Sequence, residues 1–310
     1  RSLWGKSDGG EGEGWLPLYV HMLDSIGVAE RLWDEWVPPG TRDILARGLG
    51  GDQALARTLF CLVSGLHDIG KATPAFQARP CGRLPGEGAV SLAWKPRKAG
   101  LPFRAVLSSL PAHPVAGEVI FESYLTNVRG WEKDWASSIA AIIGGHHGRP
   151  PGKGNLLDAR TNRLGEMGTH EDYGSAWTDV QRELIDCAVC WCGSDEVEGL
   201  LAKPRFLGPQ AAAIATGLVI IVDWIASNQL LFPLMRLVGE DDGADEYDDG
   251  GCENLGSEQL EVDGVLSREA FGRRGDRAWK GLGLLPYWHA TDSGRVDADE
   301  RFRARFSLPQ

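Results

Sequence analysis

The sequence of 310 residues lacks the cysteine pattern of a secreted, disulfide-stabilised protein. Its six cysteines are irregularly spaced, whereas small secreted folds carry many cysteines in a dense framework. Cys187, Cys190 and Cys192 lie close together, but no second Cys or His pair at zinc-finger spacing follows them, and apolar residues separate them. We therefore expect these thiols to be buried as small hydrophobic side chains in a cytoplasmic protein.

The sequence also lacks a hydrophobic run long enough for a membrane anchor. The longest apolar stretch, Ala211 to Val222, has twelve residues and stops at Asp223. A helix needs about 20 apolar residues to span a bilayer. The stretch therefore predicts a buried helix, and we expect no membrane partner.

A phosphate-binding loop is missing too. The segment Trp4-Gly5-Lys6-Ser7 resembles the end of such a loop, but the first glycine of that motif would have to precede Arg1. No predicted strand leads into the segment, as the motif requires, and no other Walker-type sequence is present. We expect no ATPase activity in this chain.

Positive charge is in short supply, since the net charge is −11. The whole imbalance comes from one segment, Glu240 to Asp263, which contains eleven acidic residues and no Lys, Arg or His. Removing those eleven charges from the total leaves zero for the remaining chain. The rest of the surface is therefore free to carry basic patches that bind nucleic acid.

Helical periodicity of apolar residues is abundant, and alternating strand patterns are scarce. The sequence therefore predicts an all-α fold. Residues 79–103 and 149–173 are rich in glycine, proline or basic residues and are expected to form two long loops. Helices are expected over seven segments, at about residues 15–36, 52–68, 115–126, 131–143, 176–191, 209–235 and 268–281, and Asp52 is expected to be the N-cap of the second of these helices.

Histidine is rare, with only seven in the chain, yet most of the histidines lie on or beside predicted helices. A single histidine on an apolar helix face is usually a core residue, so their combination is the informative feature. The adjacent His67 and Asp68 place two metal ligands at one helix end, and the two carboxylate oxygens of Asp68 can bridge two ions. The candidate histidines are His21, His67, His113, His146 and His147.

Asp223 interrupts the most apolar helix of the sequence. A buried carboxylate costs several kcal/mol unless it is paired or coordinates a metal. Either a metal ion or an Arg or Lys partner satisfies this requirement. The sequence therefore predicts that Asp223 faces a cation.

The order of these residues resembles that of the HD phosphohydrolases, and more narrowly the HD nuclease domain of the type I CRISPR-associated helicase-nuclease. The resemblance extends from about Leu3 to Leu234. A lone His-Asp pair would be weak evidence, but several motifs in the right order are specific. The matching segments are Trp4-Gly5-Lys6-Ser7, His67-Asp68-Ile69-Gly70-Lys71, His146-His147-Gly148 and Asp223-Trp224-Ile225-Ala226-Ser227.

The resemblance implies an HD-type helical bundle around a two-metal site. One ion would be held by His21, His67, Asp68 and Asp223, and the other by Asp68, His113, His146 and His147. Such a nitrogen-rich set suits Fe, Mn, Co, Ni or Zn better than Mg. Two divalent ions would activate a water molecule for attack on phosphorus and neutralise the leaving oxygen.

Two further residues are assigned catalytic roles beside Asp68. Lys71 follows His67 by one helical turn and is placed to contact a phosphate oxygen, with a solvated lysine as the alternative. Ser227 shares a helix face with Asp223 and is placed to orient a ligand or a phosphate, with a purely structural hydroxyl as the alternative.

Two basic segments are candidates for DNA binding. The first interleaves positive charge with aromatic rings, a mixture that proteins use to bind single-stranded DNA, although a basic loop is often only solvated. The candidate residues are Trp94, Lys95, Arg97 and Lys98, with Phe103 and Arg104 close by, in the first segment, and Arg149, Lys153, Arg160 and Arg163 in the second.

We therefore predict a metal-dependent nuclease that cuts single-stranded DNA in CRISPR interference, with a helicase module and the RNA-guided surveillance complex as partners. The alternatives are a phosphohydrolase of nucleotides or cyclic dinucleotides and a catalytically inactive HD module with a regulatory role. The expected organisation is an HD nuclease domain over residues 1–236, an acidic linker or insertion over 237–267, and a C-terminal helix and connector over 268–310. That connector would lead towards a helicase, so the chain is either a fragment or a stand-alone nuclease subunit.

Overall fold

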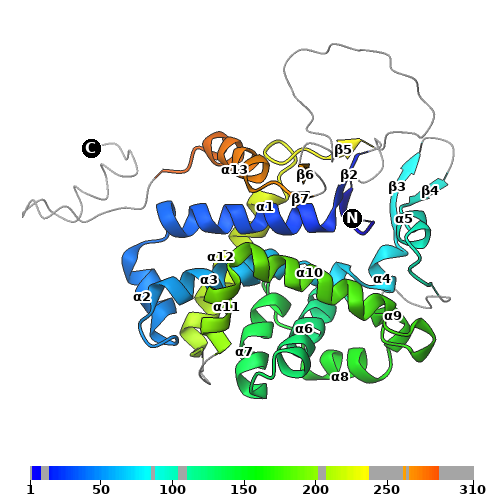
Figure 1. Cartoon of the computed structure of the whole chain (residues 1–310), viewed down its shortest axis with the longest axis horizontal. Coiled ribbons are helices and arrows are strands. Elements are labelled where there is room, and N and C mark those ends of the chain that lie inside the picture. Colours follow the sequence, from blue (N-terminus) through cyan, green and yellow to red (C-terminus); the bar gives the residue numbers. More distant parts are fainter. Residues whose placement is uncertain are drawn as a thin grey trace, which may run out of the picture.

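A computed structural model describes residues 2–7, 14–84, 88–103, 110–201, 207–236, 261–262 and 265–285 of the chain. The described part is mostly helical, which confirms the predicted fold class (Figure 1). The helices are α1 (Leu18–Arg31), α2 (Pro39–Arg47), α3 (Gln53–Leu66), α4 (Pro74–Gln77), α5 (Trp94–Lys98), α6 (His113–Ser123), α7 (Lys133–Gly144), α8 (Lys153–Thr161), α9 (Leu164–Met167), α10 (Ala176–Cys192), α11 (Ser194–Leu201), α12 (Pro209–Ala226) and α13 (Arg268–Leu282).

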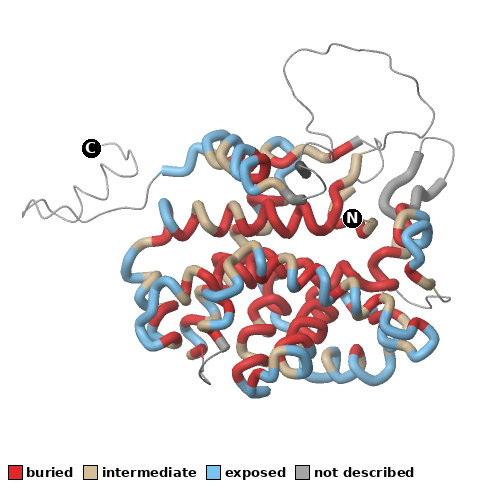
Figure 2. The backbone as a smooth tube through the Cα atoms, in the orientation of Figure 1, coloured by how far each residue is buried: buried red, intermediate tan, exposed pale blue. Residues whose placement is uncertain are grey.

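The central helices pack α1 against α3, α12 and α13, while α6 packs against α7. Their inner faces are buried, and α1 is buried along most of its length (Figure 2). The N-terminus of α3 is capped as predicted, because the Asp52 carboxylate accepts hydrogen bonds at 3.0 Å from the backbone N–H groups of Ala54 and Leu55. The apolar faces meet in one large core that includes Leu18, Ile26, Phe60, Leu66, Phe121, Val219 and Val222.

The sequence failed to predict several short elements. The strands are β1 (Trp4–Ser7), β2 (Gly14–Pro17), β3 (Pro80–Leu84), β4 (Gly88–Ser91), β5 (Met235–Arg236), β6 (Glu261–Val262) and β7 (Val265–Leu266). They form an antiparallel sheet in the order β1-β2-β5 and two hairpins, β3-β4 and β6-β7. Segments of two to five residues are too short to show a periodic apolar pattern, so sequence periodicity did not reveal them.

The prediction of two long loops is also wrong, because both segments contain elements that the apolar pattern of the sequence did not reveal. Residues 79–103 contain the β3-β4 hairpin and α5, and residues 149–173 contain α8, α9 and the short 3-10 turn Glu171–Tyr173. Several helix boundaries also differ from the prediction. Residues 15–17 belong to β2 rather than to the first helix, and α12 ends at Ala226, nine residues before the predicted end at Met235.

By length and composition alone, α12 would be able to cross a membrane, and it is the one helix in the described part of the chain that meets this criterion. Its position argues for the alternative, because α12 packs against α1, α2, α3 and α7. The side chains of Leu218, Val219 and Val222 are buried in this packing. We therefore interpret α12 as a core helix of the bundle, as the sequence predicted.

Gly70 allows α6 to approach the short 3-10 turn η2 (Ile69–Lys71), which directly follows Asp68. A Cβ atom on Gly70 would lie 1.9 Å from the carbonyl oxygen of His113 and 2.5 Å from the backbone nitrogen of Gly117. Both neighbours are backbone atoms of α6, so a side chain at position 70 would have to displace the helix. This close approach brings the first residue of α6, His113, to Asp68.

At the other side of the bundle, an ion pair fixes α13 along α1 (Figure 1). The Nε atom of Arg274 lies 2.9 Å from Oδ1 and 3.0 Å from Oδ2 of Asp24, and both side chains are almost fully buried. Burial raises the pKa of Asp24 to about 6, although the positive charge of Arg274 opposes this shift. This arrangement makes α13 part of the packed helical body.

We predict that Gly70→Ala destabilises the fold and separates His113 from Asp68. Overpacking against backbone costs about 1–3 kcal/mol or more, which denaturant unfolding measures directly. Gly272→Ala is the matched control, because a Cβ atom at position 272 meets nothing within 4 Å. The control is expected to gain roughly 0.5–1 kcal/mol from helix propensity. Equal unfolding midpoints for the two variants would contradict this account of Gly70.

We also predict that Arg274→Met costs about 3–5 kcal/mol at pH 8, because it leaves the Asp24 carboxylate buried without its partner. Since the folded-state pKa of Asp24 is raised, its protonated form favours folding at low pH, and that contribution is lost as pH rises through about 6. The cost should therefore shrink at pH 5. Arg273→Met removes an exposed pair with Glu269 and should change the free energy of unfolding by less than about 1 kcal/mol.

Candidate metal centre

The structure brings all seven predicted metal ligands together from five places in the chain. His21 comes from the first turn of α1, His113 is the first residue of α6, and Asp223 lies in the last turn of α12. The other four residues follow helix ends, with His67 and Asp68 after α3 and His146 and His147 after α7. Helix ends suit this role because their side chains converge without interrupting the packed helices.

Four of these residues form a first cluster, in which one ligand atom of each lies within 4.8 Å of the others. The Nε2 atom of His21 lies 3.1 Å from Oδ2 of Asp68. The Nε2 atom of His67 lies 3.6 Å from the same oxygen and 3.3 Å from Oδ1 of Asp223. The members of this cluster are His21, His67, Asp68 and Asp223.

A second cluster contains three histidines, His113, His146 and His147, again with ligand atoms within 4.8 Å of one another. The other oxygen of Asp68, Oδ1, faces this cluster and lies 3.2 Å from Nε2 of His113 and 3.8 Å from Nε2 of His146. Asp68 therefore presents one carboxylate oxygen to each cluster. This is the arrangement required of a carboxylate that bridges two ions.

The histidines are oriented for metal binding. The Nδ1 atom of His67 lies 2.7 Å from the carbonyl oxygen of Ser64, and Nδ1 of His146 lies 2.6 Å from that of Ile143. Since Nδ1–H donates to a carbonyl in each case, the neutral ring keeps its lone pair on Nε2. Among the described residues, the atoms that are buried and have no hydrogen-bond partner include Nε2 of His21, His67, His113 and His146. Unsatisfied buried nitrogens of this kind fit a divalent cation.

Burial keeps most of these histidines neutral. It lowers the pKa of His21 and of His146 to about 3 each, and it lowers the pKa of His113. Burial also disfavours the charged form of His67, but the carboxylates of Asp68 and Asp223 outweigh it and raise the pKa of that ring.

Two lysines, Lys71 and Lys6, surround Asp68. Lys71 is buried rather than solvated, and its Nζ lies 2.5 Å from Oδ2 of Asp68 and 2.9 Å from the carbonyl oxygen of Gly5. Burial would raise the pKa of Asp68, but the charges of Lys71 and His67 hold it well below its usual range. Asp68 is therefore ionised and ready to bind a cation.

Lys6 is the residue of the site that the sequence did not predict. Its Nζ lies 2.5 Å from the hydroxyl oxygen of Ser227, 3.5 Å from Oδ1 of Asp223 and 3.9 Å from Oδ2 of Asp68. The Ser227 hydroxyl in turn donates a 2.7 Å hydrogen bond to Asp223. Asp223 therefore faces a cation as predicted, and one such cation is the Lys6 ammonium. The Asp223 side chain is 17% exposed. The contact joins residues 6 and 223, which no local pattern links.

The first basic segment forms a platform that includes one residue missed by the sequence, Trp15. The Nζ atom of Lys95 lies 4.0 Å from the ring centroid of Trp15 and 4.6 Å from that of Trp94, which is half exposed. Arg97 lies over the ring of Phe103 at 5.0 Å. These contacts are within the range of cation–π interactions. Arg104 falls outside the described residues.

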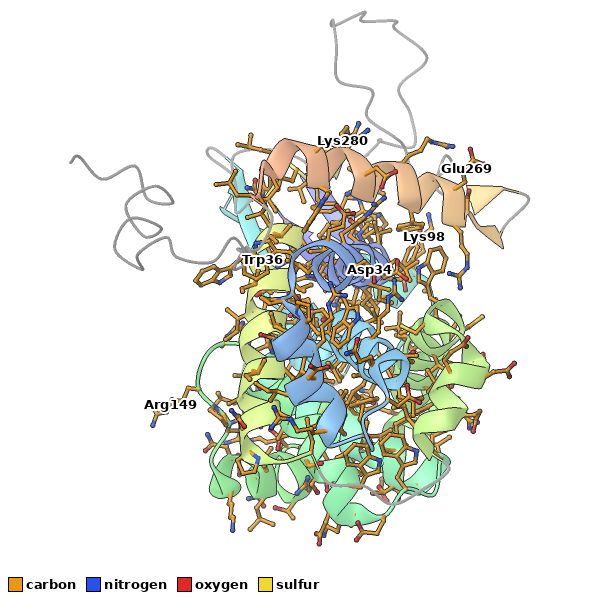
Figure 3. The ribbon with its side chains drawn as sticks, turned by 90° about the vertical axis from the view of Figure 1, so that its left-hand side faces the viewer. Asp34, Trp36, Lys98, Arg149, Glu269 and Lys280 are labelled. Carbon is orange, nitrogen blue, oxygen red and sulfur yellow. The ribbon has the colours of Figure 1, made fainter. Side chains whose placement is uncertain are left out.

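The second basic segment is partly neutralised within the chain. An oxygen of Glu122 accepts a 2.5 Å hydrogen bond from Arg160, and Arg163 pairs with Asp158 at 2.9 Å. Arg149 and Lys153 are exposed. Figure 3 shows Arg149 at the lower left edge of the molecule and Lys98 in the upper half, well away from Arg149.

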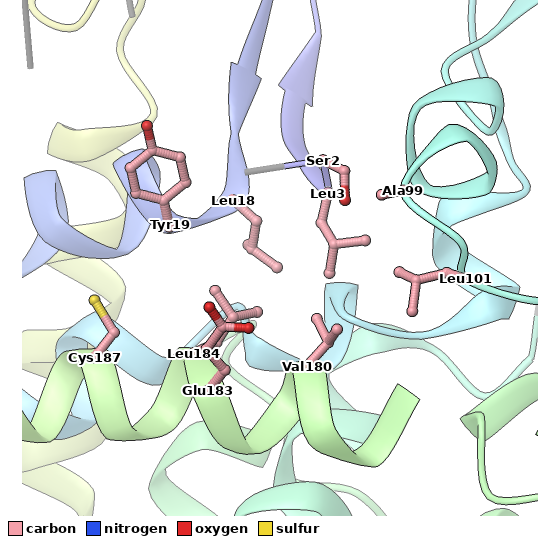
Figure 4. A pocket seen from close by; sticks show the side chains of 10 residues that line it. All are labelled: Ser2, Leu3, Leu18, Tyr19, Ala99, Leu101, Val180, Glu183, Leu184 and Cys187. Atoms are coloured by element: carbon pink, nitrogen blue, oxygen red, sulfur yellow. The ribbon is translucent and has the colours of Figure 1, made fainter. Parts of the chain in front are cut away.

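A cavity of about 370 Å³ lies elsewhere, between the residues that precede β1, the start of α1, the residues that follow α5, and α10 (Figure 4). Leu3, Leu18, Leu101, Val180 and Leu184 make its lining mainly apolar. None of the ten residues that line this cavity belongs to either histidine cluster. The chemistry of the metal centre therefore does not take place in this cavity.

Comparison with known proteins supports this centre. Residues 4–232 match the protein family described as Cas3, HD domain. The chain is 31% identical over 237 residues to the CRISPR-associated nuclease/helicase Cas3 of Streptococcus thermophilus, which covers 72% of this chain and 24% of that protein. It is 32% identical over 238 residues to the CRISPR-associated endonuclease/helicase Cas3 of Thermus thermophilus, which covers 76% of this chain and 23% of that protein. The chain thus spans about a quarter of the length of these relatives.

Solved structures share the fold. A crystal structure of a CRISPR-associated protein matches with a TM-score of 0.69 and 26% identity, over 100% of this chain and 29% of that one. The Thermus thermophilus Cas3 HD domain, crystallised in the presence of Ni²⁺, matches with a TM-score of 0.54 and 24% identity, over 93% of this chain and 98% of that one. A chain of an RNA-guided CRISPR surveillance complex in a pre-nicking state matches with a TM-score of 0.59 and 24% identity, over 90% and 28%. The family match over residues 4–232 and the two Cas3 relatives confirm the family resemblance of the sequence, and the chain belongs to the Cas3 HD domain family.

Proposed function

We propose that this chain is a metal-dependent nuclease that hydrolyses phosphodiester bonds of single-stranded DNA in CRISPR interference. The observation that carries the proposal is the position of Asp68, whose two oxygens face two separate histidine clusters. A carboxylate in this position can hold both ions of a two-metal hydrolase, whose ions lie about 3.5–4 Å apart. The relatives that match over most of the chain are named nuclease/helicase and endonuclease/helicase.

In this proposal, one divalent cation is held by the first cluster, and the second is held by the three histidines of the second cluster together with Asp68. Cations at these positions would lower the pKa of a bound water and stabilise negative charge on the leaving oxygen. A set of five histidines and two aspartates favours Fe, Mn, Co, Ni or Zn over Mg. The structure of the Thermus thermophilus relative was determined with Ni²⁺ present, in agreement with this preference.

The surrounding side chains hold the ligands in place. Lys71 contacts Asp68 at 2.5 Å and is itself fixed by the carbonyl oxygen of Gly5, so it fixes the orientation of the bridging carboxylate. Its burial favours this role over direct contact with a phosphate. Ser227 orients Asp223 through their 2.7 Å hydrogen bond. Both residues thus act on metal ligands, and their predicted catalytic roles become positioning roles.

The platform of Trp94, Lys95 and Trp15 supports single-stranded DNA as the substrate. Exposed aromatic rings stack on unpaired bases, and the lysine attracts the backbone. The platform is connected to the metal centre, because Trp15 packs on the apolar cluster of Trp4, Phe76 and Leu92. The Phe76 ring lies 5.7 Å from that of His113. Packing contacts through Trp15 and Phe76 therefore link the platform to the second cluster.

The proposed partners follow from the length of the relatives. Because this chain corresponds to about a quarter of nuclease/helicase proteins, we propose that it acts with a helicase module in the cytoplasm. The RNA-guided surveillance complex would expose the DNA strand, as the match to such a complex suggests. The predicted division into residues 1–236, 237–267 and 268–310 stays a prediction, in which α13 of the third segment packs against α1 of the first. Most of the acidic segment lies outside the described residues.

An assay of metal-depleted protein tests the proposed function. We expect cleavage of single-stranded DNA with Mn²⁺, Co²⁺ or Ni²⁺ and less with Mg²⁺, in parallel incubations that also offer duplex DNA, deoxynucleotides and cyclic dinucleotides. His147→Ala should reduce bound metal and slow cleavage by more than roughly 10–100-fold, the usual cost of losing an outer partner of a metal site. His147 is exposed, so this variant should fold normally.

Three results of this assay would contradict the proposed nuclease or its ligand set. Turnover of deoxynucleotides or cyclic dinucleotides without strand cleavage would replace the nuclease by a small-molecule phosphohydrolase. Inertness with every metal would identify a regulatory HD module. A full metal content in folded His147→Ala protein would show that the proposed ligand set is wrong.

Trp94→Ala tests the DNA platform separately from the metal centre. Loss of one stacking ring should weaken binding of single-stranded DNA by about 1–3 kcal/mol, measured by fluorescence anisotropy, while metal content stays unchanged. Val128→Ala is the control, since it removes an exposed apolar side chain at the end of the turn that follows α6. DNA affinity that is equal in both variants would exclude Trp94 from the binding surface.

A further inference from the structure

Lys6 has a position that the proposed ligand set does not explain. It lies in β1, whose pairing with β2 places Lys6 opposite Leu16. The neighbouring carbonyl oxygen of Gly5 accepts a hydrogen bond from Lys71. The strand is therefore attached to the centre, and it directs the Lys6 ammonium towards Ser227, Asp223 and Asp68.

The two lysines at the centre differ in how firmly they are held. Lys71 is buried and has two partners, Asp68 at 2.5 Å and Gly5 at 2.9 Å. The Lys6 side chain is 24% exposed, and its hydrogen-bonding partner at short distance is the neutral hydroxyl of Ser227. Its nearest carboxylate oxygen, on Asp223, is 3.5 Å away. Lys6 is thus the lysine that can leave its position at low cost.

The carboxylate oxygens near Lys6 are the same atoms that the first cluster offers to a cation. Both Oδ1 of Asp223 and Oδ2 of Asp68 lie within 4.0 Å of the Lys6 ammonium, and both belong to the first cluster. An ion bound by these oxygens would share them with a second positive charge. Like charges at such short range repel each other strongly, even with partial solvent screening.

We propose that Lys6 is a counter-ion that exchanges partners. It neutralises Asp223 until a divalent cation binds the first cluster, and its ammonium then binds a non-bridging oxygen of the substrate phosphate. The flexible four-carbon stem allows this movement, and lysine binds phosphate as a point charge. This inference rests on the proposed function. It adds that Lys6 weakens metal binding in the absence of substrate and strengthens binding of the phosphate.

Lys6→Met tests the inference because methionine replaces the aliphatic stem of lysine with an unbranched side chain of similar length and removes the charge. We expect Ni²⁺ alone to bind the variant roughly tenfold more tightly than it binds the wild-type chain, measured by isothermal titration calorimetry. Lys6→Arg keeps the positive charge and should retain the wild-type affinity. Lys280→Met is the control for loss of an exposed positive charge in α13, and should also leave the affinity unchanged.

Thermal unfolding supplies a second measurement, which a purely structural lysine would not affect in the same way. Without metal, Lys6→Met should melt at a lower temperature than the wild-type chain, because Asp223 has lost a counter-ion. With saturating Ni²⁺ the difference should close. A difference that persists with Ni²⁺ would mean that Lys6 only anchors β1, and would overturn the proposal. If Lys6→Met does not fold, Lys6→Gln replaces it.

Binding of the Lys6 ammonium to the substrate phosphate is tested with single-stranded DNA at saturating Mn²⁺. Under these conditions Lys6→Met should bind DNA more weakly and cleave it more slowly than the wild-type chain. Unchanged or weaker Ni²⁺ affinity in folded Lys6→Met would refute the exchange while leaving the nuclease intact. Absence of Ni²⁺ binding by the wild-type chain would instead refute the metal centre itself. The two failures are therefore distinguishable.

Discussion

The buried carboxylate of Asp68 is the interaction on which the rest of the centre depends. A carboxylate with almost no exposure to solvent must be compensated by cations or donors. In this chain the compensation comes from α1 through His21, from α6 through His113, and from the turn after α3 through Lys71. The packing of these helices and the chemistry of the site are therefore fixed by the same group.

The surrounding bundle maintains a polar centre at a cost to its own stability. Several imidazole nitrogens are buried with no hydrogen-bond partner among the described residues, although such groups usually find one. Departures of this kind concentrate at functional sites, where a ligand supplies the missing interaction. A cation that binds the folded chain and not the unfolded chain would increase the free energy of unfolding and so offset this cost. The apolar packing of α1, α3 and α12 therefore supports a site that is not optimised for folding.

The surface shows how similar sequence patterns can have different structural meanings. Around Lys95, positive charge lies against the exposed ring of Trp94 and can meet both the backbone and the bases of a DNA strand. In α8 and after it, Arg160 and Arg163 are already paired with carboxylates of the same chain. Both segments are basic in sequence, but two arginines of the second segment are neutralised by ion pairs within the chain. The density of arginine and lysine alone does not distinguish a binding surface from a network of ion pairs.

The sequence by itself determined the helical class, the Asp52 cap of α3 and the identity of the seven metal-site candidates. Helical periodicity, capping residues and adjacent ligands are local patterns, which can be recognised in a single amino-acid sequence. Only the tertiary structure decided which oxygen of Asp68 faces which cluster, that Gly70 lets α6 approach to backbone contact, and that Lys6 reaches Asp223. These features depend on side-chain direction and on pairs of residues up to 217 positions apart. Such relations are set by packing, and no periodicity in the sequence encodes them.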